Sequence, residues 1–169
     1  MKRFDVIKST TDDQRFLDFA TRVLASGPCE DRPNMANIDL MAMPKLVPNI
    51  YILDFRKGID DGLLMKFAGT EVERNYPTRL QGNYLDKAYT GHDSKELFMN
   101  VYRRAYQHGE SFFTRRVVRY EEENDDQKYR LATALFFTCF SGTGDVDYGI
   151  GLAFYDFARE SIDPVFCIV

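Results

Sequence analysis

The chain has 169 residues, of which 44% are hydrophobic and 28% are charged, and its formal net charge at pH 7 is −4. These values are typical of one globular domain with a flanking element and disfavour two full domains. A mildly acidic chain also disfavours nucleic acid as a partner, because most nucleic-acid binders carry a clustered basic surface.

The first residues, MKRFDVIKSTTDDQ, carry charges where a secretory signal needs an apolar segment. No apolar run approaches the roughly 18 residues of a membrane helix. We therefore expect a cytoplasmic protein that does not bind a membrane. Cys29, Cys139 and Cys167 form no C-x-x-C pair and are odd in number, which favours free thiols, and we expect all three to be packing residues.

The first predicted element is an amphipathic helix within STTDDQRFLDFATRVLASGP. Its apolar residues recur at helical spacing, Thr11 and Gln14 have the spacing of a capping box, and Gly27-Pro28 ends it. A connector with three prolines follows, CEDRPNMANIDLMAMPKLVPN.

Two short strands are predicted next, IYILDF and LLMKFAG, paired in antiparallel fashion through the turn RKGIDDG. Gly69 and Thr70 end the second strand. Thr70 is predicted to cap a short helix, EVERNY, and glycine at positions 69 and 82 lets the chain turn sharply at both ends of that helix. Gly82 therefore marks the start of the next connection.

The strongest helical pattern in the chain is SKELFMNVYRRAYQH, with Ser94 as the cap and Gly109 after the last turn. Three strands are predicted after it, SFFTRRVVRY, KYRLATALFFTCF and YGIGLAFYDF, separated by two polar turns. The final segment, ARESIDPVFCIV, has no clear pattern. This order of elements predicts the α+β class.

The order of elements, together with two segments, resembles that of PAS domains. KFAGTEVERNYPTRLQGNYLDKAY is similar to the segment of a bacterial PAS family in which the second strand ends in Gly-Thr, a short helix follows, and a glycine begins the next turn. IDLMAMPKLVPNIYILDF is similar to that family's approach to its first strand. Each motif is short, and the specificity lies in their combination.

The resemblance implies an α+β fold with a PAS-like five-stranded antiparallel sheet, its helices on one face, and a ligand pocket between the helices and the sheet. An N-terminal amphipathic helix is added to this fold. We accordingly expect an N-terminal helix and connector in residues 1–29, a PAS-like domain in residues 30–157, and a C-terminal tail in residues 158–169.

The resemblance implies a stand-alone sensory, ligand-binding or protein-interaction module in signalling and not an enzyme. Its output would then pass through a homodimer or a separate signalling protein, with the N-terminal helix and the apolar end VFCIV as the expected surfaces. Two alternatives stay open: a small-molecule isomerase or dehydratase on a cone-shaped α+β fold, and a dimerisation module with a filled core.

Six side chains are candidates for the pocket lining, because strand alternation and helix periodicity would aim them inward together. They are Phe67, Tyr76, Tyr102, Leu135, Phe137 and Leu152. The sequence names no catalytic residue and no metal site; GHDS at positions 91–94 cannot form a relay from consecutive residues. A cluster of arginines at positions 115, 116 and 119 is interpreted as an exposed, charge-compensated edge.

The cofactor is unknown from the sequence, and a small organic ligand is compatible with the expected pocket. Haem is disfavoured, because the two histidines, His92 and His108, form no motif and a histidine at the end of a helix suits the helix dipole. Flavin adduct chemistry is disfavoured as well. Light sensors of the PAS superfamily carry a reactive cysteine directly after an asparagine, where this chain has Tyr84 after Asn83.

Overall fold

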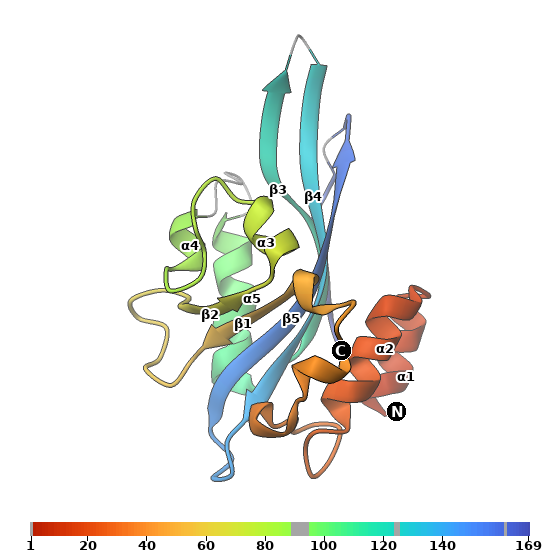
Figure 1. Ribbon diagram of the computed structural model, residues 1–169, viewed down its shortest axis with the longest axis vertical. Coiled ribbons are helices and arrows are strands. Elements are labelled where there is room, and N and C mark those ends of the chain that lie inside the picture. Colours follow the sequence, from red (N-terminus) through yellow and green to blue (C-terminus); the bar gives the residue numbers. More distant parts are fainter. Residues whose placement is uncertain (1, 89–94, 124–125, 161) are drawn as a thin grey trace.

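A six-stranded antiparallel sheet forms the centre of the part of the chain that the computed structural model describes, residues 2–88, 95–123, 126–160 and 162–169 (Figure 1). The strand order is β2-β1-β5-β4-β3-β6. The strands are β1 (Ile50–Asp54), β2 (Met65–Ala68), β3 (Phe112–Glu123), β4 (Asp126–Phe140), β5 (Val146–Ala158) and β6 (Val165–Ile168).

Helices lie on both faces of the sheet (Figure 1). α1 (Arg3–Thr10) and α2 (Gln14–Leu24) cover one face, and α3 (Thr70–Arg74), α4 (Leu85–Ala88) and α5 (Lys95–His108) cover the other. Three 3-10 turns, Met35–Asn37, Leu40–Ala42 and Val47–Asn49, form the connector from α2 to β1. The helices α3–α5 stand between β2 and β3 in the chain, so the fold is PAS-like α+β and not a cone with its helices ahead of the sheet.

The central strands are apolar on both faces because successive side chains enter two different cores. Phe136 of β4 packs beneath α3–α5, stacked on Phe112 with ring centroids 4.9 Å apart. The next residue, Phe137, packs against Phe19 of α2 on the opposite face. The predicted helix-covered face is thus confirmed, and α1 and α2 add a second layer on the other side.

The start of α2 lies two residues later than the capping box placed it. Asp13 is the N-cap, and its carboxylate accepts a hydrogen bond of 2.9 Å from the backbone N–H of Arg15. The Thr11 hydroxyl instead accepts from the N–H of Asp13. The Arg15 side chain also pairs with Asp13 and holds the pKa of that carboxyl below its ordinary value. Capping by an aspartate contributes roughly 1 kcal/mol to a helix.

The segment expected to be a tail, residues 158–169, supplies a sixth strand where the sequence predicted five. β6 pairs with β3 from Phe112↔Ile168 to Arg115↔Val165, and the N–H of Val169 donates to the carbonyl of Ser111. Four residues after a proline carry little pattern of their own. The pairing depends on the edge of β3, more than 40 residues earlier in the chain, which sequence periodicity does not reveal.

Two glycines fix the ends of the connection from β2 to α4, for different reasons. Gly82 has φ +82°, a left-handed conformation that other residues adopt only at a cost. Gly69 has an ordinary φ, but a Cβ there would lie 2.3 Å from the carbonyl oxygen of Val47. Thr70 is the first residue of α3 and does not cap it, since Gly69 is the N-cap. The side chain of Glu73 in α3 accepts hydrogen bonds from the N–H groups of Leu80 and Gln81, which holds the loop that leads to Gly82.

Candidate ligand-binding site

Small side chains form the floor of a cavity beneath α3 and α4. Ala134 of β4 and Ala153 of β5 are direct cross-strand neighbours, and Ala132 lies two residues along β4 on the same face. All three are buried. The roof of this inner cavity comes from Val72 of α3 and Leu85 of α4, with other walls from Met65, Tyr51, Tyr76, Tyr102, Arg116 and Tyr155. Alanines in place of large residues leave room that the short helices above them only partly fill.

Tyrosines supply the polar groups of the inner cavity. The hydroxyls of Tyr51 on β1 and Tyr102 on α5 lie 2.8 Å apart and share a hydrogen bond, and Tyr102 is fully buried. The Tyr76 ring meets Tyr155 edge-on at 6.4 Å. Burial raises the pKa of both Tyr51 and Tyr155 well above the ordinary value, and the neighbouring phenols, Tyr102 and Tyr76, act in the same direction. These tyrosines are therefore neutral and can donate hydrogen bonds.

Arg116 of β3 brings a positive charge into the same region. Its side chain is 7% exposed, and the guanidinium carbon lies 4.5 Å from the centre of the Phe98 ring on α5, a cation–π contact. The charge of Arg116 opposes the rise in the pKa of Tyr51 and of Tyr155. The charge of this one guanidinium thus acts to lower the pKa of phenols on two other strands.

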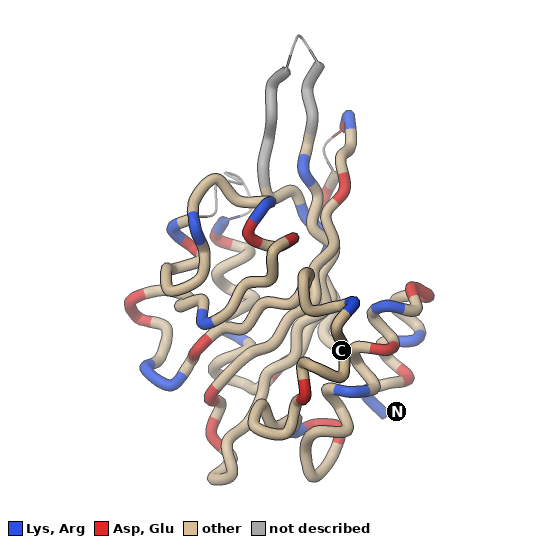
Figure 2. The backbone as a smooth tube through the Cα atoms, viewed as in Figure 1, with Lys and Arg blue, Asp and Glu red and all other residues tan. Residues whose placement is uncertain are grey.

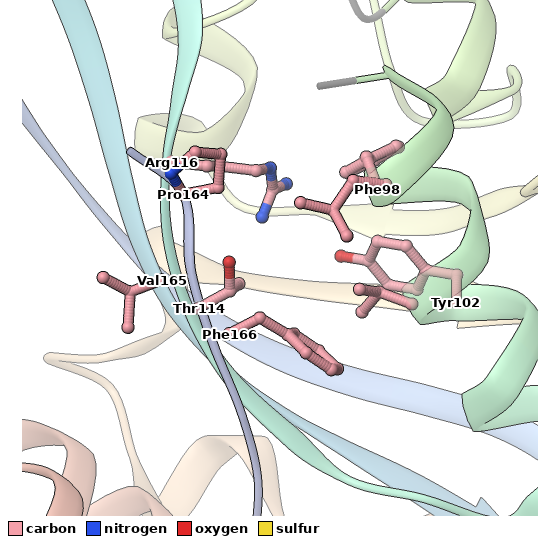
Figure 3. Close-up of a pocket in the computed structure, with 9 residues that line it drawn as sticks. Phe98, Tyr102, Thr114, Arg116, Pro164, Val165 and Phe166 are labelled. Carbon is pink, nitrogen blue, oxygen red and sulfur yellow. The ribbon is translucent and has the colours of Figure 1, made fainter. Parts of the chain in front are cut away.

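A second cavity lies between α5, β3 and β6, on the other side of Arg116 and Tyr102. It is lined by Leu97, Phe98, Val101, Tyr102, Thr114, Arg116, Pro164, Val165 and Phe166. Figure 3 shows the guanidinium of Arg116 and the hydroxyls of Tyr102 and Thr114 directed into the same gap. Because Arg116 and Tyr102 line both cavities, these two residues form the partition between an inner and an outer cavity.

Both cavities are narrow in this conformation. Each cavity has a volume of about 10 Å³, which is room for roughly one water molecule. A larger ligand therefore requires the short helices α3 and α4 to move outward, or the Arg116–Tyr102 partition to rearrange.

The structure does not bring together the six pocket residues expected from the sequence. Tyr76 and Tyr102 line the inner cavity, whereas Phe67, Leu135, Phe137 and Leu152 pack on the opposite face with α2. Their neighbours, among them Ala134, Phe136 and Ala153, face α3–α5 instead. A strand buried on both faces has no polar–apolar alternation to show which residue points inward, and a one-residue error exchanges the two faces.

The most important polar group of the site, Arg116, was interpreted from sequence as exposed, and this interpretation was wrong. Phe112, Thr114, Arg116 and Val118 are all buried, while Arg115 is exposed. Counting forward in steps of two from an inward-facing Phe112 would have placed Arg116 in the interior. The adjacent arginines and the acidic turn that follows concealed this alternation.

His108, the histidine within the described residues, lines neither cavity. His108 is exposed at the end of α5, beside a surface hollow bordered by Gly109, Phe140 and Asp145. His92 lies outside the described residues. No group of three or more His, Cys, Asp or Glu side chains that could hold a metal ion occurs among the residues that were placed.

The cysteines are not equivalent. Cys139 is fully buried against α2, and burial raises the pKa of its thiol, so it is an unreactive packing residue as expected. Cys167 of β6 is half-buried. Cys29 is exposed in the connector after α2, so the expectation that it packs in the interior was wrong. Its place after Pro28 carried no periodicity to indicate this.

Lys and Arg residues are interspersed with Asp and Glu along the helices and connections of the described chain (Figure 2). Oppositely charged side chains form ion pairs, such as Arg56 with Asp54, with a nitrogen–oxygen distance of 2.7 Å, and Arg104 with Glu110, with a distance of 2.8 Å. Exposed pairs of this kind contribute little to stability. None of the helices that the structure describes combines the length and the apolar character needed to span a membrane.

Comparisons with known proteins give a structural likeness and no match in sequence. No family model matches the sequence, and no curated protein matches it significantly. Among solved structures, the crystal structure of a sensory box sensor histidine kinase from Vibrio cholerae is 12% identical, and the alignment covers 69% of this chain and 90% of that chain with a TM-score of 0.39. At this identity and TM-score, no ligand and no residue role passes from that kinase to this chain.

Proposed function

We propose that this chain is a sensory module that binds a small organic ligand between α3–α5 and the sheet, and that it is not an enzyme. The observation that carries the proposal is the inner cavity, in which alanines of two strands share the lining with phenols and a buried guanidinium. Burying polar groups is costly, and small ligands bind where an apolar recess carries a few polar groups.

The cover of the inner cavity favours uptake of a ligand. α3 has five residues and α4 has four, and each places one side chain, Val72 or Leu85, on the cavity. A helix of one turn is held by few hydrogen bonds of its own, so it can shift at low cost. The sheet beneath is held by long antiparallel ladders and provides the fixed surface.

The chemistry of the lining favours binding over catalysis. Among the described residues that line the two cavities there is no Asp, Glu, His or Cys. The raised pKa of Tyr51 and of Tyr155 keeps both phenols protonated at neutral pH, so neither is a general base. An isomerase or dehydratase would need a proton acceptor facing its substrate.

Output by association is part of the proposal. Leu97, Val165 and Ile168 are among the exposed large apolar side chains, 44%, 46% and 45% exposed, and the first two also line the outer cavity. We therefore expect a ligand-dependent change in association, with a second copy of the chain or with a separate signalling protein.

The first test is to fill the floor of the inner cavity. In Ala134→Val and Ala153→Val the added methyl groups overlap the ligand space, so ligand affinity should fall by about tenfold or more. Freshly purified protein is denatured and its small-molecule extract analysed by mass spectrometry. Thermal shifts with a library of small organic compounds complete the comparison.

Ala42→Val is the matched control, because Ala42 is exposed in a 3-10 turn and does not line the cavity. It should retain the ligand and the thermal shifts of the wild type. If no compound is extracted and none raises the Tm of the wild type, or if the filled variants bind as well as the wild type, the inner cavity is not a ligand site.

A further inference from the structure

The partition between the two cavities has the chemistry of a carboxylate site. Arg116 offers a planar set of N–H donors whose geometry matches a carboxylate with two parallel hydrogen bonds. Thr114 and Tyr102 are 5% and 0% exposed, and their hydroxyls are directed into the same gap (Figure 3). The guanidinium and the Tyr102 hydroxyl therefore lie where the cavities meet, and the Thr114 hydroxyl faces the same gap from the outer cavity.

Arg116 brings a positive charge to this region. The effect of Arg116 on the phenols of β1 and β5 shows that its charge acts across the cavity, and a charge acts more strongly inside a protein than in water. Arg116 is the one cationic side chain in the described lining, which holds no Asp or Glu, so a ligand with a single negative charge matches this lining. Burying a dianion such as a phosphate monoester would leave a further charge to be desolvated.

The rest of the inner cavity is apolar and suits the other end of such a molecule. Ala132, Ala134 and Ala153 form the floor, Val72 and Leu85 lie over it, and Met65 forms part of a side wall. An aliphatic chain or an aromatic ring would be covered on both sides there, with its acid group toward Arg116.

We propose that the ligand is a monocarboxylic acid with an apolar body, whose carboxylate binds Arg116 and whose body lies on the alanine floor. This inference rests on the proposed ligand-binding function and assigns its ligand class. It places the recognition of the acid at the partition, so that ligand occupancy acts directly on Tyr102 of α5 and on the lining of the outer cavity.

The test compares acids with their uncharged amides on the wild-type protein. The pairs are benzoate and benzamide, phenylacetate and phenylacetamide, and hexanoate and hexanamide, measured by thermal shift and by isothermal titration calorimetry at neutral pH. We expect each acid that binds to bind about tenfold or more tightly than its amide, because only the acid can form a charged pair with the guanidinium.

Arg116→Gln should reduce this preference for the acid to nearly one, while leaving any binding of the amide. Arg115→Gln is the matched control, since Arg115 is the adjacent residue of the same strand and is exposed. It should keep the preference. Arg116→Lys keeps the charge without the planar fork and should give an intermediate preference, which provides a second variant if the glutamine variant does not fold.

The outcomes separate the two proposals. Binding of neutral compounds with equal or weaker binding of the acids would overturn the carboxylate site and leave the ligand-binding function standing. An unchanged preference in a folded Arg116→Gln or Arg116→Lys would do the same. Failure of every acid and every neutral compound to bind, with an empty extract, would overturn both.

Discussion

Individual tyrosines give this protein a predictable response to alkali. Tyr51 is buried and Tyr155 is partly buried, and their pKa values are raised well above those of exposed tyrosines, chiefly by burial. A raised pKa in the folded state means that the unfolded chain loses these protons first as the pH increases. The stabilising effect is therefore complete below about pH 10 and is lost as the pH rises above it toward the folded-state pKa.

We expect the free energy of unfolding to fall above about pH 10 by up to ~1.4 kcal/mol per pH unit for each of these tyrosines. Urea unfolding at a series of pH values measures the slope, and tyrosinate absorbance reports when the buried phenols ionise. Tyr51→Phe should lower the slope. Equal slopes in the wild type and in Tyr51→Phe would contradict this prediction, because they would mean that Tyr51 ionises at the same pH in the folded and unfolded states.

At the scale of secondary structure, local signals predicted most elements and long-range pairing hid the rest. Helical spacing and a C-terminal glycine gave α5, and β-rich runs between polar turns gave β1–β5. The strand β6 and the face of each central strand depend on which segments pack against them. Phe136 and Phe137 are adjacent and equally apolar, so only the presence of α5 on one side and α2 on the other distinguishes them.

The glycines at the ends of elements provide a prediction at this scale. In Gly69→Ala the new Cβ would lie 2.3 Å from the oxygen of Val47 and 2.4 Å from that of Pro48, both backbone atoms. The connector or the start of α3 would have to move, and we expect a loss of about 2–4 kcal/mol or more. In Gly82→Ala nothing lies within 4 Å, and the cost is the left-handed φ alone, about 1–2 kcal/mol.

Gly142→Ala is the matched control, because a Cβ there meets nothing within 4 Å and its φ lies outside the left-handed region. Its stability should match that of the wild type or exceed it slightly. Urea denaturation of the three variants gives the order directly. A Gly69→Ala variant more stable than Gly82→Ala would mean that the connector before β1 yields easily and does not hold α3 in place.

At the scale of the whole molecule, the position of the N-terminal helices limits which surfaces are left for a partner. The sequence left the amphipathic face of α2 as an interface candidate, whereas in the structure Phe16, Phe19 and Val23 are buried against the sheet of the same chain. The apolar side of α2 is therefore part of the core. Any surface for a partner on this side must lie on its polar face or elsewhere.

We accordingly expect removal of residues 1–27 to abolish cooperative folding and not merely to release a monomer. The deletion would expose Phe137, Ile150 and Leu152 and remove the side chains that cover them. Burial of each large apolar side chain is worth about 1.5–3 kcal/mol, and the total stability of a domain is only about 5–15 kcal/mol. Calorimetry and light scattering should show no sharp transition and a tendency to aggregate.

Two point variants separate packing from association. Phe19→Ala should lower stability by about 3–5 kcal/mol without changing the mass of the native particle, because it opens a cavity between α2 and β4. Arg22→Ala, on the exposed side of α2, should leave stability within about 0.5 kcal/mol. A truncated chain that unfolds sharply and has half the native mass would contradict this account and make α1 and α2 an interface. Retention of the native mass by a well-folded truncated chain would move the search for the partner surface to the edge formed by α5 and β6.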